Sequence, residues 1–87
     1  MPRNKLEPII RALFLQTFAE HTGAPHEGAL EESTVLLETG LDSLGFAILV
    51  TRLEEELQFD PFTLSKDPYY PTTFGEFVAF YAANEPR

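Results

Sequence analysis

Three segments of this 87-residue chain carry apolar residues three or four positions apart, and this spacing constrains the fold more than any other feature. Such spacing places side chains on one face of an α-helix. No segment alternates apolar and polar residues over the length of a strand, so the sequence predicts an all-α fold. The periodic positions are Ile10, Leu13, Phe14 and Phe18, then Phe46, Leu49, Val50, Leu53 and Leu57, and finally Phe74, Phe77, Val78 and Tyr81.

The length allows one modest core, so we expect a single domain over residues 1–87. Asparagine, aspartate and threonine cap helix starts, proline fits a first turn, and glycine ends a helix. These signals predict a small four-helix bundle, with three main helices and a short third helix over residues 61–65. The main helices should run from between Asn4 and Pro8 to near Gly23, from Ser43, capped by Asp42, to Leu57 or Gln58, and from a Thr73–Glu76 capping box to near Asn84.

Residues 22–41 form a long connection of a kind that is uncommon in small domains unless it has a function. It carries Leu30, Val35, Leu36, Leu37 and Leu41. These apolar residues predict that the connection is pinned to the core, and it has room for a short helical turn. A second loop, Asp67–Pro71, is rich in proline and tyrosine and has no functional interpretation from the sequence.

Composition argues against several kinds of function. Without cysteine the chain forms neither a disulfide nor a zinc–thiolate site, and its histidines and carboxylates show no metal-site spacing. The net charge is −8, and no lysine or arginine lies between Arg11 and Arg52. Such a surface repels nucleic acid, and it either attracts basic partners or only keeps the domain dissolved. With no apolar run near the about 20 residues that span a bilayer, and no secretory signal, we expect a soluble, cytoplasmic protein.

The helix over residues 43–57 has apolar residues on two sides. At about 100° per residue, its five periodic positions form one stripe, which is the expected core face. Leu44, Ala47 and Ile48 lie on the opposite side, with Glu54 and Glu55 toward the helix end. Either the long connection or the short helix covers this second patch, or the patch is an exposed docking strip with an acidic rim.

Ser43 occupies the first helical position, where unpaired N–H groups and the positive end of the helix dipole favour a phosphate on its hydroxyl. Serine and aspartate are also common at helix starts for capping alone. A serine nucleophile would need a base. Nothing in the sequence directs His21 or His26 at Ser43, so we interpret both histidines as surface or helix-capping residues.

The stretch from Leu36 to Leu44, LLETGLDSL, resembles the acyl and peptidyl carrier proteins, whose signature is a Gly-hydrophobic-Asp-Ser-Leu turn into a helix. The helix order and the acidic charge extend the resemblance over nearly the whole chain. It implies a non-catalytic carrier that receives a 4′-phosphopantetheine arm from coenzyme A on Ser43, through a phosphopantetheinyl transferase. The arm would hold acyl or aminoacyl cargo as a thioester.

The resemblance also implies roles for neighbouring residues and for partners. Asp42 would cap the helix beside the phosphodiester. The residues expected to contact partner enzymes are Leu44, Ala47, Ile48, Glu54 and Glu55. Besides the transferase, the expected partners are an adenylating ligase, a synthase or an acyltransferase with a basic docking surface. The short length and the complete-looking N-terminus favour a freestanding carrier, which we expect to be a monomer.

Two positions depart from the family pattern. Ile48 stands where fatty-acid carriers often have an acidic residue, which favours a specialised partner. Gly45 makes the helix up to about 1 kcal/mol less stable than alanine would at this position. Either the glycine lets a partner or the arm approach closely, or it has no function. Two other hypotheses stay open: a helical adaptor that binds through the strip around Ile48 without a prosthetic group, and a small hydrolase that uses Ser43.

Overall fold

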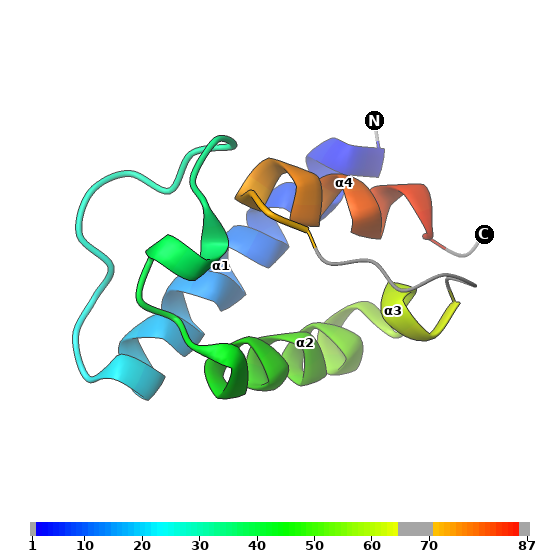
Figure 1. Cartoon of the computed structure of the whole chain (residues 1–87). Helices are drawn as coiled ribbons and strands as arrows, with labels where there is room; N and C mark the ends of the chain where they lie inside the picture. Colours follow the sequence, from blue (N-terminus) through cyan, green and yellow to red (C-terminus); the bar gives the residue numbers. More distant parts are fainter. Residues whose placement is uncertain (1, 65–70, 86–87) are drawn as a thin grey trace.

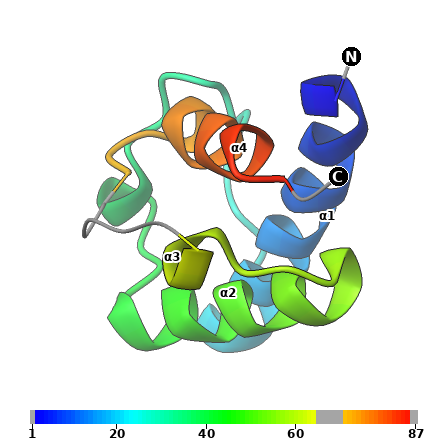
Figure 2. The same cartoon turned by 90° about the vertical axis from the view of Figure 1, so that its right-hand side faces the viewer.

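The computed structural model describes the backbone of residues 2–64 and 71–85, and the side chains of residues 5–63 and 71–85. Its elements are α1 (Pro2–Thr22), the 3-10 helix η1 (Leu36–Glu38), α2 (Ser43–Leu57), α3 (Pro61–Leu64) and α4 (Phe74–Ala83). α1 packs against both α2 and α4, and the long connection passes around one end of the bundle (Figure 1). α3 lies beside α2 and beneath α4 (Figure 2). The predicted all-α bundle is therefore confirmed, and no described helix is long and apolar enough to cross a membrane.

The core forms where the apolar stripes of α1, α2 and α4 meet. In α2, Leu49 and Leu53 are fully buried, and the other periodic residues pack partly buried around them, as the periodicity predicted. The buried hydrophobic side chains of the other two helices are Leu6, Ile10, Phe14 and Phe18 in α1, and Phe74, Phe77, Val78 and Tyr81 in α4. One face of α2 is thus used for folding, and its opposite face is left for other contacts.

α1 begins earlier than the sequence predicted. It starts at Pro2, not between Asn4 and Pro8, and it keeps Pro8 in its interior. Leu6 lies one turn before Ile10 on the same stripe and is 4% exposed. The longer helix therefore buries one more leucine, which stabilises the fold by about 2 kcal/mol and offsets part of the roughly 3 kcal/mol that a proline costs inside a helix.

The other helix ends follow the predicted capping. Gly23 adopts a left-handed conformation (φ 86°) just after α1. Thr73 accepts a hydrogen bond from the Glu76 N–H (3.1 Å), and the Glu76 carboxylate accepts one from the Thr73 N–H (3.3 Å), which completes the capping box of α4. α2 ends with Gln58 as its C-cap, and α3 covers the described part of the predicted short helix. Residues 67–70 of the second predicted loop lie outside the described residues.

The long connection is pinned to the core, but not at every predicted position. Leu30, Leu36 and Leu41 are buried and Val35 is half-buried, whereas Leu37 is 78% exposed. Leu36 and Leu37 are neighbours in η1, where successive side chains point in different directions, so one of them faces the core and the other faces outward. The predicted helical turn is confirmed, and the prediction that Leu37 helps to anchor the connection was wrong.

Backbone hydrogen bonds join this connection to the start of α4. The Leu36 N–H donates to the Thr72 carbonyl (2.9 Å), and the Phe74 N–H donates to the Thr34 carbonyl (2.8 Å). Together they form an isolated antiparallel β-bridge within the described residues. The bridge fixes η1 in place, close to the start of α2.

Candidate functional site

Ser43 is the first residue of α2, and its side chain is exposed. The chain is held firmly just before it: Leu41 is 3% exposed, and Gly40 takes a left-handed conformation (φ 103°) that closes the connection. The hydroxyl therefore projects from a fixed helix start. An anionic group on this hydroxyl would lie at the positive end of the helix dipole, beside unpaired N–H groups.

Asp42 is the N-cap of α2, as predicted. Its Oδ1 accepts hydrogen bonds from the Gly45 N–H (2.8 Å) and from His21 Nε2 (2.8 Å). The bond from Gly45, followed by the bond from His21, holds the pKa of the Asp42 carboxyl below its ordinary value of 3.8. The carboxylate is therefore ionised near neutral pH, and because it can then only accept hydrogen bonds, His21 must donate through Nε2.

His21 is the site residue that the sequence did not reveal. It lies in the last turn of α1, where the capping alternative placed it, but its side chain is only 22% exposed and is hydrogen-bonded to Asp42, the residue before Ser43. Gly45 makes room for it: a Cβ on Gly45 would lie 2.8 Å from His21 Cδ2 and 2.5 Å from Leu41 Cδ1. The glycine thus permits an internal close approach, and a glycine in the first turn of a helix was the sequence signal for it.

The geometry does not support a serine hydrolase. His26 is half-buried with its ring edge against Phe14 and Phe18 (centroids 6.4 and 5.2 Å), so it is not the surface residue that we expected. Among the described residues, neither histidine is hydrogen-bonded to the Ser43 hydroxyl, as a general base would be. Nor does the described part of the chain group three metal-binding side chains in one place.

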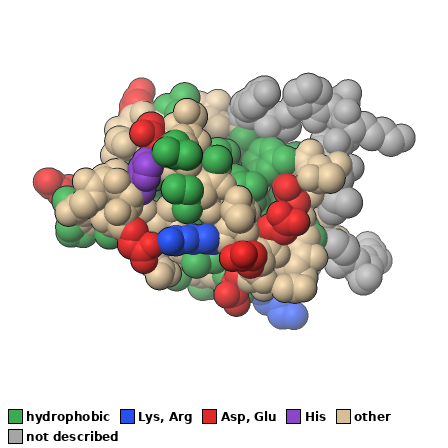
Figure 3. Space-filling model, turned by 90° about the horizontal axis from the view of Figure 1, so that it is seen from below, with side chains coloured by type: hydrophobic (Ala, Val, Ile, Leu, Met, Phe, Trp, Pro, Cys, Tyr) green, Lys and Arg blue, Asp and Glu red, His purple; other side chains and the backbone are tan. Residues whose placement is uncertain are grey.

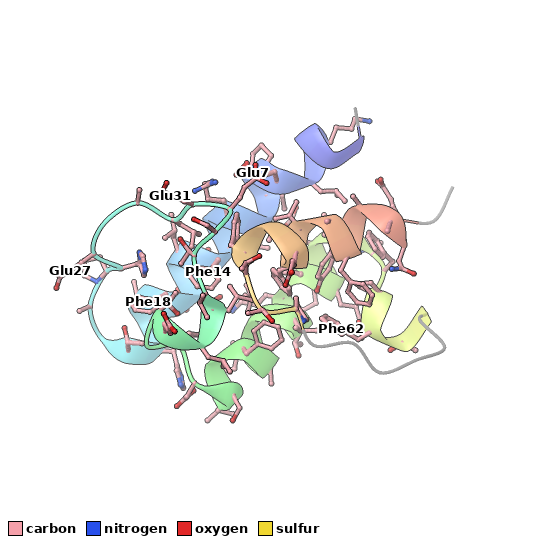
Figure 4. All side chains as sticks on the ribbon, turned by 45° about the horizontal axis from the view of Figure 1, so that its top comes forward. Glu7, Phe14, Phe18, Glu27, Glu31 and Phe62 are labelled. Atoms are coloured by element: carbon pink, nitrogen blue, oxygen red, sulfur yellow. The ribbon has the colours of Figure 1, made fainter. Side chains whose placement is uncertain are left out.

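An apolar groove of about 520 Å³ opens beside Ser43. It lies between α2 and η1, with α3 at one side. Its lining includes Leu36, Leu37, Ser43, Phe46, Val50 and Phe62. The Phe62 ring is directed from α3 toward the α4 side chains (Figure 4), and it packs edge-on against Phe46 with the ring centroids 6.3 Å apart. The groove can therefore receive an apolar group tethered at Ser43.

The outward face of α2 is exposed. Leu44 is 62% exposed, Ala47 is exposed and Ile48 is half-buried, so the alternative in which the connection or α3 covers this patch is wrong for Leu44 and Ala47. Glu54 and Glu55 are exposed further along the helix. Figure 3 looks onto this side of the molecule and shows apolar side chains among acidic ones. The face thus exposes Leu44, Ala47, Glu54 and Glu55, and Ile48 is partly accessible beside them.

Arg52 lies on α2 but does not leave a free positive charge on this face. Its guanidinium donates to Glu20 Oε1 (2.5 Å) and to the hydroxyl of the buried Thr17 (3.1 Å), both on α1. Hydrogen bonds from Arg52, and then from Gln16, hold the pKa of Glu20 below its ordinary value. Because Arg52 is already paired with α1, the exposed part of α2 remains acidic.

Comparison with known proteins gives one finding for this site. A family described as "Phosphopantetheine attachment site" matches residues 12–63, which is more than half of the chain. The matched region runs from α1 to α3, and it includes both Asp42 and Ser43. Searches of the curated proteins and of the solved structures found no match to the chain.

Proposed function

The chain belongs to the acyl and peptidyl carrier protein family, whose members hold 4′-phosphopantetheine covalently, and we propose that Ser43 is the residue to which this group is attached. One observation carries the proposal: an exposed hydroxyl stands at the start of a helix, directly after the capping aspartate. Ser33, the other serine in the matched region, lies in the long connection and has no such surroundings.

The backbone around Ser43 fits a phosphodiester. The Gly45 N–H donates to the Asp42 side chain (2.8 Å), and the Phe46 N–H donates to the Asp42 carbonyl (2.9 Å). Among the described residues nothing accepts a hydrogen bond from the N–H groups of Ser43 and Leu44. These two donors, together with the helix dipole, supply the electrostatics that a phosphate on the hydroxyl requires.

Attachment of the group exchanges a phosphoric anhydride bond of coenzyme A for a phosphate ester on Ser43. The Ser43 oxygen forms a P–O bond to the pantetheine phosphate of coenzyme A, the pyrophosphate bond breaks, and adenosine bisphosphate leaves with the hydroxyl proton taken up by the transferase or by solvent. When bound, the group supplies a thiol that holds cargo as a thioester. The chain itself presents the hydroxyl, stabilises the phosphate charge and offers the apolar groove as a shelter.

We assign the partner surface to the outward face of α2. Its residues are Leu44, Ala47, Ile48, Glu54 and Glu55, and Leu37 adds an exposed apolar side chain across the groove. Apolar anchors with a charged rim are typical of protein interfaces. A basic docking surface on the transferase, and on a ligase, synthase or acyltransferase, would complement the acidic rim and speed encounter.

The groove also bears on the cargo. Its apolar lining favours an acyl group over an aminoacyl group, because an ammonium buried without a partner is costly. The apolar Ile48 favours a dedicated partner, such as an adenylating ligase, over the standard enzymes of fatty-acid synthesis. Such a carrier would work in the cytoplasm as a monomer.

Mass spectrometry of the intact protein tests the attachment residue. After incubation with coenzyme A and a promiscuous phosphopantetheinyl transferase, the mass should rise by one phosphopantetheine. Ser43→Ala should abolish the gain, whereas Ser33→Ala, a matched change at another exposed serine, should leave it intact. A chain that gains no mass with several transferases, or gains it equally in Ser43→Ala, would refute the assignment.

A helical adaptor without a prosthetic group is the second candidate, because the apolar strip on α2 is exposed. The two functions differ in what they require of Ser43. An adaptor should bind its partner normally with Ser43→Ala and lose binding with Ile48→Asp. A carrier should lose its role with Ser43→Ala, and Ile48→Asp should also weaken its contacts with partners.

A further inference from the structure

The end of α1 meets the start of α2 directly behind Ser43. His21 lies in the last turn of α1, and its Nε2 donates to Asp42 Oδ1 at 2.8 Å. The same oxygen accepts the N–H of Gly45, and the missing side chain of Gly45 leaves the space that the His21 ring fills. One carboxylate oxygen therefore receives one donor from its own helix and one from the preceding helix.

The charge of this His21–Asp42 pair depends on pH. Histidine is the side chain that ordinarily gains a proton between about pH 8 and pH 5. Since the carboxylate is ionised, the pair carries one negative charge when the ring is neutral and no net charge when the ring is protonated.

Few other charged groups lie on the elements around His21. At the start of α2 the charged group is Asp42, and in η1 it is the exposed Glu38. One residue back along α1, Glu20 is exposed, and its carboxylate is paired with Arg52 of α2 at 2.5 Å. Among the described residues, Asp42 is the charged group bonded to His21, so its carboxylate and any new charge beside it dominate the surroundings of the ring.

We propose that His21 is a positioning residue for the group on Ser43: it fixes the capping carboxylate of Asp42, and in its protonated form it offsets the charge of that carboxylate beside the phosphodiester. The inference rests on the proposed function. A phosphodiester on Ser43 adds a negative charge one residue from Asp42. The modified protein should therefore hold the proton of His21 more tightly, and by linkage the protonated ring should favour modification.

Proton NMR of the native protein tests this directly, because the chain has two histidines and each reports separately. Their imidazole C–H signals are followed against pH, at low salt, before and after modification of Ser43. The midpoint for His21 should rise by about half a pH unit, the shift that a unit charge several ångströms away produces in a water-like medium. The midpoint for His26, whose ring packs against Phe14 and Phe18, should not move.

Two variants of His21 test whether its hydrogen bond positions the Asp42 carboxylate. His21→Gln keeps a donor for Asp42 without a titrating ring, and His21→Leu keeps neither. His21→Leu should load more slowly than His21→Gln, because nothing then holds the carboxylate from the side of α1.

The outcomes are distinct. An unchanged or lowered His21 midpoint after modification overturns the inference, and so do equal loading rates for His21→Gln and His21→Leu. The NMR result comes from the native protein, so it stands even where His21→Leu does not fold. A native protein that gains no phosphopantetheine overturns the assignment of Ser43 instead, and the two failures cannot be confused.

Discussion

The starts of α2 and α4 are built from similar parts and differ in what they leave open. Both helices have a capping side chain that accepts a hydrogen bond from an N–H three residues on, and both have a glycine in the first turn. In α4 the first residue is Phe74, which is 0% exposed, and Glu76 closes the box by bonding back to Thr73. In α2 the first residue is the exposed Ser43.

The two glycines sharpen the contrast. Beside Gly75 the near neighbour is Glu32, from the connection that α4 holds in place, so this glycine serves packing. Beside Gly45 the neighbours are Leu41 and His21, which support the cap from behind while the front of the helix start stays open. A closed helix start contributes stability, and an open one offers its unpaired N–H groups and its hydroxyl to a ligand.

The largest expected difference between the two helix starts is in how much the first helical residue contributes to stability. Phe74→Ala should lower the free energy of unfolding by about 3 to 5 kcal/mol, because it removes a fully buried aromatic ring. Ser43→Ala, at the equivalent position of α2, should change it by less than about 0.5 kcal/mol. Urea denaturation followed by far-UV circular dichroism measures both. Similar losses from the two variants would contradict the comparison.

Substitutions of the two capping residues should have different effects on stability and on phosphopantetheine transfer. Thr73→Ala should cost about 1 kcal/mol of stability and leave phosphopantetheine transfer to Ser43 unchanged, because α4 takes no part in it. Asp42→Ala should slow the transfer by about tenfold or more, because it releases the helix start that orients the hydroxyl. A time course of intact mass measures the rate. Equal rates for the two variants would show that the cap of α2 is as purely structural as that of α4.

The smallest expected effect is on how the stability of the fold falls at acidic pH. The pKa of Asp42 is lowered in the folded protein, so its contribution is present above the ordinary carboxyl value of 3.8 and is lost as the pH falls through the lower folded value. Asp42→Asn should therefore make the loss of stability below about pH 4 shallower than in the native protein. Thermal melts across this range measure it, with Thr73→Ala as the control that keeps the native slope.

Features that depend on neighbours in the chain could be predicted from the sequence. Both caps and the end of α1 at Gly23 are set by hydrogen bonds or backbone angles within a few residues. Periodicity likewise identified the core face of α2, because a helix presents every third or fourth residue to the same side. The position of Ser43 at an open helix start followed from the same local rules.

Features that depend on distant contacts could not be predicted. The start of α1 depends on the burial of Leu6, which only the packed bundle provides. Leu36 and Leu37 are alike in sequence, and the bridge to α4 decides which of them faces the core. The contact of His21 with Asp42 spans 21 positions, and no periodic pattern connects the two.

The β-bridge between the long connection and the start of α4 joins the last helix to the space beside Ser43. η1 forms one wall of the apolar groove. The backbone N–H of its Leu36 donates a hydrogen bond to the carbonyl of Thr72, the second residue before α4. A small displacement of α4 would therefore be passed to that wall. If a chain is tethered at Ser43, as we propose, the groove width available to it depends in part on a helix that lies wholly outside residues 12–63.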